Sequence, residues 1–131
     1  MGAAFEGSQM KAVGLIAGAD LSAKQFYAVK LSASNTVIVC AATTDKPYGI
    51  LQNAPTSGQE AEVCVVGQTK INSDAALSIG VSIGTAADGQ LAAYTVSDTT
   101  KHIIGIVQQT SGAAAGYAVA FVNCASSRTL A

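Results

Sequence analysis

His102 is the only histidine in the chain, so general-base chemistry near neutral pH would depend on this one residue. It follows Thr99, Thr100 and Lys101, which have the composition of an exposed turn. A Ser-His-Asp arrangement needs an acid that orients the imidazole, and no acidic residue is marked for that role. The sequence therefore predicts no catalytic residues, and we expect that the protein is not an enzyme.

Metal binding needs several histidine, cysteine or carboxylate side chains that converge at a suitable spacing. Cys40, Cys64 and Cys124 are far apart, and Glu60 with Glu62 is the only close acidic pair. Cys40 and Cys64 stand inside apolar runs, where a thiol behaves as a small hydrophobic group. We expect no metal, no cofactor and reduced, buried thiols, with the two glutamates on a solvated strand edge.

The charge pattern restricts the class of partner. Only 11% of the 131 residues are charged, and the seven Lys and Arg residues are scattered rather than clustered. A row of phosphates needs a basic patch, so nucleic acid is not an expected partner.

Residues 10–23 imitate a short signal peptide, but Asp20 interrupts the apolar run, and no stretch is long enough to span a bilayer. We expect synthesis in a cytoplasm, no membrane association, and a surface of small polar side chains suited to contact with other proteins.

An internal repeat organises the chain. Residues 47–66, PYGILQNAPTSGQEAEVCVV, align without a gap with residues 103–122, IIGIVQQTSGAAAGYAVAFV, so that Gly49 matches Gly105 and Gln52 matches Gln108. The constant shift of 56 residues predicts two tandem, structurally similar units over residues 11–66 and 67–122. Together they form a single domain of residues 1–131, with short flexible arms at residues 1–10 and 123–131.

The apolar pattern within each unit is typical of short strands. Residues 26–31, 36–40 and 48–53 are rich in β-branched and aromatic residues and are bounded by turn residues. Asp88-Gly89 predicts a hairpin, whereas residues 73–81 allow one helical turn. We expect an all-β fold, a compact small β-barrel or closed sandwich. The residues expected to face its core are Ala61, Val63 and Val65, and their counterparts Tyr117, Val119 and Phe121.

Three segments carry a resemblance to a known family. They are residues 19–31, ADLSAKQFYAVKL; residues 45–71, DKPYGILQNAPTSGQEAEVCVVGQTKI; and residues 86–95, AADGQLAAYT. With the repeat, they resemble the small capsid decoration, or cement, proteins of tailed bacteriophages over nearly the whole chain from Met10 to Asn123. The resemblance implies a β-structured virion protein on the outer surface of the expanded head. It further implies a homotrimer that bridges neighbouring major capsid protein subunits, without a cofactor or a reaction.

Two sets of contact residues follow as hypotheses. Phe5 and Met10 are apolar residues in a polar N-terminal arm, which predicts a capsid-binding segment. Charge is nearly absent around two further sites, which predicts subunit contacts there; their residues are Val37, Val39, Ala113, Ala114 and Ala115. Two other functions stay open: another minor virion component, such as a head fibre base, and a β-barrel ligand-binding domain.

Overall fold

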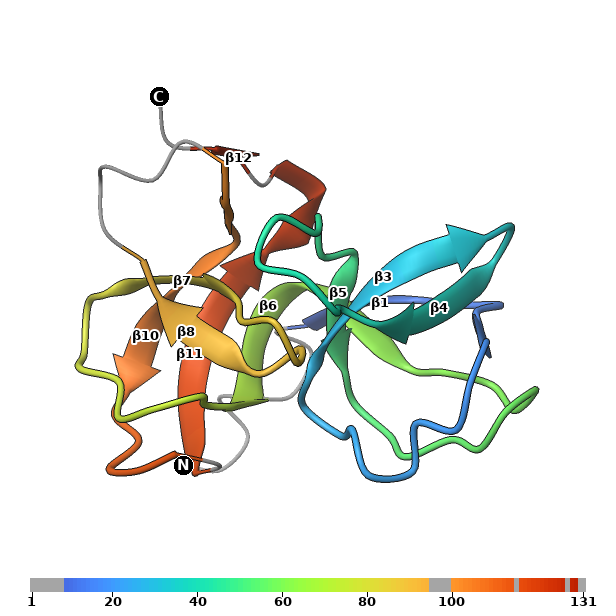
Figure 1. Ribbon diagram of the computed structural model, residues 1–131, viewed down its shortest axis with the longest axis horizontal. Helices are drawn as coiled ribbons and strands as arrows, with labels where there is room; N and C mark the ends of the chain where they lie inside the picture. The colour runs from blue at the N-terminus through green and yellow to red at the C-terminus, as the bar shows by residue number, and fades with distance from the viewer. Residues whose placement is uncertain (1–8, 95–99, 115, 127, 130–131) are drawn as a thin grey trace.

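The computed structural model describes residues 9–94, 100–114, 116–126 and 128–129 of the chain (Figure 1). These residues form an all-β fold with one short 3-10 helix, Cys124–Ser126. The strands of the N-terminal half are β1 (Gln9–Ala12), β2 (Ile16–Ala17), β3 (Ala28–Ala33), β4 (Thr36–Val39), β5 (Gly49–Leu51) and β6 (Val63–Asn72). Those of the C-terminal half are β7 (Ser82–Thr85), β8 (Leu91–Ala93), β9 (His102–Ile103), β10 (Gly105–Gln109), β11 (Tyr117–Asn123) and β12 (Arg128–Thr129). No helix in the described part of the chain is long and apolar enough to cross a membrane.

Ten strands form one mixed sheet in the order β2-β4-β3-β5-β6-β11-β10-β7-β8, with β1 paired to β6 off this path. The long antiparallel pair β6–β11 lies at the centre, and a lobe extends to each side of it (Figure 1). Outward from this pair, both halves have the same order: β6, β5, β3, β4 on one side and β11, β10, β7, β8 on the other. Two units of equal connectivity would give this arrangement, and the duplication itself stays a prediction.

The predicted closed barrel or sandwich is not confirmed. The end strands β2 and β8 do not pair with each other in the described strand order, so the sheet is open by its hydrogen bonds. Its buried side chains form two clusters instead. One includes Leu15, Leu21 and Val37 in the N-terminal lobe, and the other includes Ile83 and Leu91 in the C-terminal lobe.

The strand predictions agree with the structure in position, but the expected facing of one strand is wrong. Tyr117 is 56% and Phe121 50% exposed, whereas Ala61 and Val63 are buried as expected. The two hairpins differ by one residue in register: Ile50 lies opposite Cys64, but Ile106 lies opposite Phe121, the counterpart of Val65. A one-residue slip exchanges the faces of a strand. Tyr117, Val119 and Phe121 therefore point outward from β11, and the smaller Ala118, Ala120 and Val122 face the core.

Some residues assigned to the two arms belong to strands in the described part of the chain. Gln9 and Met10 belong to β1, which pairs with β6, rather than to a flexible arm. At the other end, Asn123 completes β11, Cys124 is buried, and β12 pairs with β9. Backbone hydrogen bonds and one buried thiol thus fix the described part of the C-terminal tail.

The helical turn expected in residues 73–81 is absent, because the serine at its start has other partners. The Ser73 hydroxyl lies 2.6 Å from the Ser111 hydroxyl and donates to the Ala113 carbonyl at 3.0 Å. The backbone amides of Ser73, Asp74 and Leu77 also donate to carbonyls outside the segment, those of Gly116, Leu91 and Ser111, so they are not available for a helical turn. The hairpin expected at Asp88-Gly89 is confirmed, since β7 and β8 pair across residues 86–90 and Gly89 has a φ of 87°.

Candidate interaction surface

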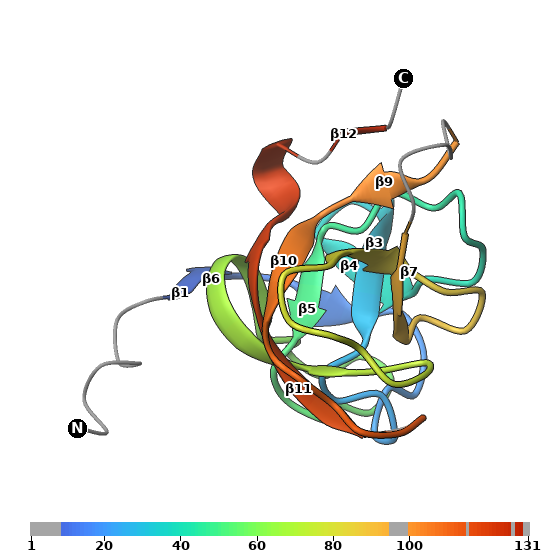
Figure 2. The same cartoon turned by 90° about the vertical axis from the view of Figure 1, so that its left-hand side faces the viewer.

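An exposed apolar patch lies on the outer side of β10 and β11, which run side by side in Figure 2. Ile106 is 54% exposed and lies directly opposite Phe121, which is 50% exposed. Directly opposed residues of antiparallel strands share one face, so the two side chains form one surface. Half-buried Ile103 adjoins them, and these three residues define the β10–β11 patch.

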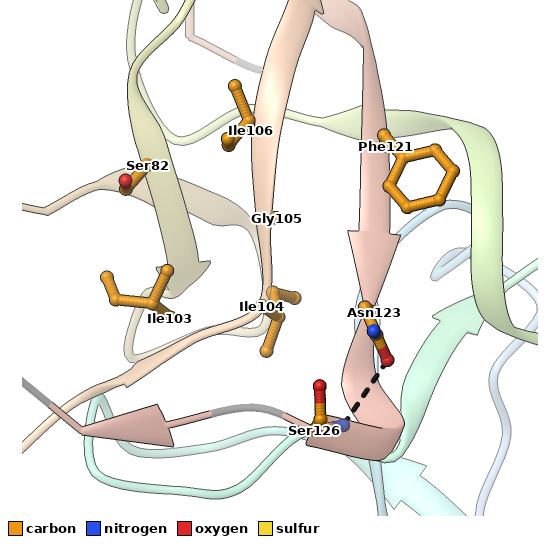
Figure 3. A pocket seen from close by; sticks show the side chains of 8 residues that line it. All are labelled: Ser82, Ile103, Ile104, Gly105, Ile106, Phe121, Asn123 and Ser126. Atoms are coloured by element: carbon orange, nitrogen blue, oxygen red, sulfur yellow. Dashed lines mark hydrogen bonds between the residues drawn. The ribbon is translucent and has the colours of Figure 1, made fainter.

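The patch surrounds a shallow hollow of about 260 Å³ (Figure 3). Gly105 lies on β10 between Ile104 and Ile106 and adds no side chain to the lining. Asn123 lines one end, where its side-chain oxygen accepts a hydrogen bond of 3.3 Å from the Ser126 backbone amide. The hollow therefore combines apolar walls with fixed polar groups at one end.

Among the residues whose side chains the structure describes, none that lines this hollow is ionisable. An approaching protein would therefore lose no hydration of a charged group at these residues, and an apolar side chain would fit between Ile106 and Phe121. Buried aromatic and aliphatic anchors with few charges are typical of the energetic centre of a protein interface. The patch has the properties of a contact surface.

The contact residues predicted from sequence are scattered in the structure. Met10 is 68% exposed on β1, whereas Phe5 and Ala115 lie outside the described residues. Ala113 and Ala114 are exposed in the turn between β10 and β11.

Val37 does not suit its predicted role as a subunit contact. Its side chain is fully buried in the N-terminal cluster, and half-buried Val39 packs against the same cluster. Because β4 turns Val37 toward the core, this side chain has no surface left for a second subunit.

His102 and the two glutamates lie in separate parts of the described structure. His102 is half-buried on β9 rather than exposed in a turn, and its Nδ1 is buried without a hydrogen-bond partner there. Glu62 pairs with Lys11 at 2.7 Å, and Glu60 is exposed beside a single bridge to Ile16. Among the described residues, no three His, Cys, Asp or Glu side chains are grouped to hold a metal ion.

Ser82 stands in residues 80–84, GVSIG, which have the Gly-x-Ser-x-Gly spacing of a nucleophile elbow. An elbow places its serine on a sharp turn between a strand and a helix. Here Ser82 begins β7, lies opposite Ile106 in an antiparallel pair, and is followed by the hairpin to β8. His102 is not among the residues that line the hollow with Ser82. Ser82 thus has the sequence spacing of a nucleophile elbow but not its strand-turn-helix geometry.

All three cysteines are buried and free. Burial raises the pKa of the Cys40 and Cys124 thiols to about 12, and that of Cys64 to about 11. Because the thiolate is the reactive form, these side chains are unreactive members of the core at neutral pH.

The raised thiol pKa values predict that stability falls in alkaline solution. Below the ordinary thiol pKa of 9.0, folded and unfolded chains are both protonated, so the thiols cause no pH dependence. Above it the unfolded chain loses thiol protons that the folded chain keeps up to about pH 11 or 12. The free energy of unfolding should therefore decrease as the pH rises from 9, which urea unfolding at increasing pH measures. Cys124→Ala should show a shallower decrease, and an equal slope in both proteins would contradict this prediction.

Comparisons with known proteins give a likeness of fold. Neither a protein-family model nor a curated protein matches the sequence. One similar solved structure is that of the head fiber gp8.5 N base in bacteriophage phi29, with a TM-score of 0.65 and 12% sequence identity. The alignment covers 88% of this chain and 96% of that chain, so almost the whole described fold is shared.

Proposed function

We propose that this chain is a structural protein of a bacteriophage virion and that it binds the outer surface of the head. The observation that carries the proposal is the shared fold with the head fiber gp8.5 N base, over 88% of this chain. Because one fold serves many functions, the proposal also rests on the surface of this chain. The low charge and the apolar β10–β11 patch favour a protein that attaches to another protein.

The partner in this proposal is the major capsid protein, and the contact is the β10–β11 patch. An apolar side chain of the capsid would enter the hollow between Ile106 and Phe121, where no charged group has to be desolvated. Bridging of neighbouring capsid subunits and assembly as a homotrimer are the finer parts of the proposal. A protein that binds only the expanded lattice stabilises it by mass action, and several linked contacts strengthen the attachment.

A second candidate function is the base of a head fibre, which the similar solved structure favours. Deletion of the gene distinguishes the two functions. Loss of a decoration protein should leave heads that break at lower temperature or in chelator. Loss of a fibre base should leave heads of normal resistance that lack projecting fibres in electron micrographs.

The expected result for the main proposal is saturable co-sedimentation with expanded heads that lack the protein. Unexpanded proheads of the same phage are the control, since their lattice presents a different surface. Pelleting with expanded heads alone would agree with decoration. If the protein pelleted with neither particle, attachment to the head would be wrong.

A further inference from the structure

A second hollow, of about 390 Å³, lies where the two lobes meet, and we call it the seam hollow. It lies within the size range of small-molecule sites. Its described lining comes from distant parts of the chain: Gln9, Phe26, Gln52, Gln68, Thr69, Lys70, Gln109 and Val119. Four of these eight residues are glutamines, so the hollow combines polar amides with an apolar floor of Phe26 and Val119.

The glutamine amides are held in place by hydrogen bonds. Gln9 Nε2 donates to the Gln68 carbonyl at 2.6 Å, and Gln52 Nε2 donates to Thr69 Oγ1 at 2.7 Å and to the Ile50 carbonyl at 3.0 Å. The Nε2 groups are thereby engaged within the protein. The carbonyl oxygen of Gln52 accepts only a long contact of 3.4 Å from Gln9 Nε2. These two glutamines therefore present acceptor oxygens to a ligand with hydroxyl donors.

Gln109 differs from these two glutamines because its amide makes no hydrogen bond within the described residues. It is exposed at the end of β10, so its donors and its acceptor are both available. The hollow thus offers fixed acceptors on one side and an unengaged amide on the other.

The aromatic floor is held in a strained conformation. Phe26 has a φ of 69°, which is uncommon for a bulky residue. Its backbone amide donates to the Leu51 carbonyl at 2.7 Å, and its carbonyl accepts from the Asn72 amide at 3.0 Å. The ring meets Tyr117 edge to face, with centroids 5.6 Å apart. Backbone strain that the surroundings maintain is often found at binding sites.

Among the described lining residues, Lys70 alone has an ionisable side chain. Its Nζ lies 6.0 Å from the centroid of the Phe26 ring, where the ring partly balances the charge. The described lining holds no carboxylate. A ligand that fits therefore carries no positive charge, is rich in hydroxyl groups, and is apolar on the face that lies against Phe26 and Val119.

We propose that the seam hollow binds a neutral sugar residue of a glycan. A pyranose ring has one apolar face of C–H groups for Phe26 and an edge of hydroxyl groups for the glutamine amides and Lys70. This inference goes beyond the function proposed above, and sugar binding by the single chain does not depend on it. If the proposed virion role holds, weak binding at each hollow of many copies would add up to firm attachment to a glycan-covered surface.

Titration of the purified chain with the methyl glycosides of glucose, galactose and N-acetylglucosamine, followed by amide NMR, tests the proposal. At least one sugar should shift the side-chain signals of Gln9, Gln52 and Gln109 and the backbone signal of Phe26. Gln109→Ala should weaken that binding about three- to tenfold, the effect of one hydrogen bond. Gln59→Ala, an exposed glutamine that does not line the hollow, should leave it unchanged.

Three outcomes would overturn the proposal. The first is no shift at tens of millimolar of any of the sugars. The second is shifts that Gln109→Ala leaves unaltered. The third is equal or tighter binding of N-acetyl-trialanine amide, which would assign the hollow to an extended peptide instead. Phe26→Leu keeps an apolar side chain on the floor but removes the ring, so it should reduce sugar binding more than peptide binding.

Discussion

The double variant Ile106→Asp, Phe121→Asp is expected to lose binding to expanded heads. Both side chains flank the hollow of the β10–β11 patch and lie directly opposite each other. Each substitution removes an apolar anchor and adds a carboxylate that would have to be desolvated on contact. Loss of a central anchor typically costs about 2 kcal/mol or more, so two losses should weaken binding by at least a hundredfold. Co-sedimentation over a range of protein concentrations measures this change.

The matched control is Val13→Asp, because Val13 is an 86% exposed apolar residue outside the patch. It should bind heads as the unaltered protein does. Ile106 and Phe121 are each about half exposed, so each replacement should lower the free energy of unfolding by about 1 kcal/mol, and repulsion between the two opposed carboxylates adds to this cost. A folded double variant that still binds heads at full strength would show that the contact lies elsewhere on the molecule.

The sequence was sufficient to predict local features whose cause is local. β4 and β5 lie within the apolar runs that predicted them, β3 overlaps its run but is shifted by two residues, and the turn at Asp88-Gly89 joins β7 to β8. Alternation of apolar side chains identifies a strand but does not say which face is inward when both faces carry apolar residues. On β11 the register of the pairing with β10 determines the inward face, so that the alanines point to the core and the aromatic rings point outward.

The seam hollow could not be predicted from the sequence, because its lining residues are far apart in the chain. Gln9 and Gln109 are a hundred residues apart in the chain, and the successive pairing of β1, β6, β11 and β10 brings their strands to one place. Glutamine is a common surface residue, so a single glutamine in the sequence does not indicate a binding site. A weak signal was present in the repeat, where Gln52 and Gln108 match. Gln52 lines the hollow, and Gln108 accepts a 2.7 Å hydrogen bond from Gln68, which also lines it.

The two matched glycines of the repeat allow close packing of strands. A glycine inside a strand often marks a bulge, but the pairing shows no register shift at Gly49 or Gly105. What the two positions share is close approach of a neighbouring backbone. A Cβ on Gly49 would overlap the Cys64 carbonyl and the Val63 side chain, and one on Gly105 would overlap the Phe121 carbonyl.

Gly49→Ala is therefore expected to be strongly destabilising. Gly49 is buried between β3 and β6, and a backbone carbonyl cannot move aside as the end of a flexible side chain can. Either β5 must separate from β6 or both strands must shift. Overpacking of this kind costs about 3 kcal/mol, and for a domain of this size the midpoint of thermal unfolding should fall by roughly 10 °C.

Gly112→Ala provides the control for Gly49→Ala, because it adds the same methyl group at an exposed position where nothing lies within 4 Å of the new Cβ. Its midpoint should change little, since surface substitutions usually stay within about 0.5 kcal/mol. Calorimetry of the three proteins compares one methyl group in two environments. Similar midpoints for Gly49→Ala and Gly112→Ala would show that β5 and β6 have room to separate. A large decrease for Gly49→Ala alone would mean that the repeated glycine is retained because two strands approach too closely for any side chain.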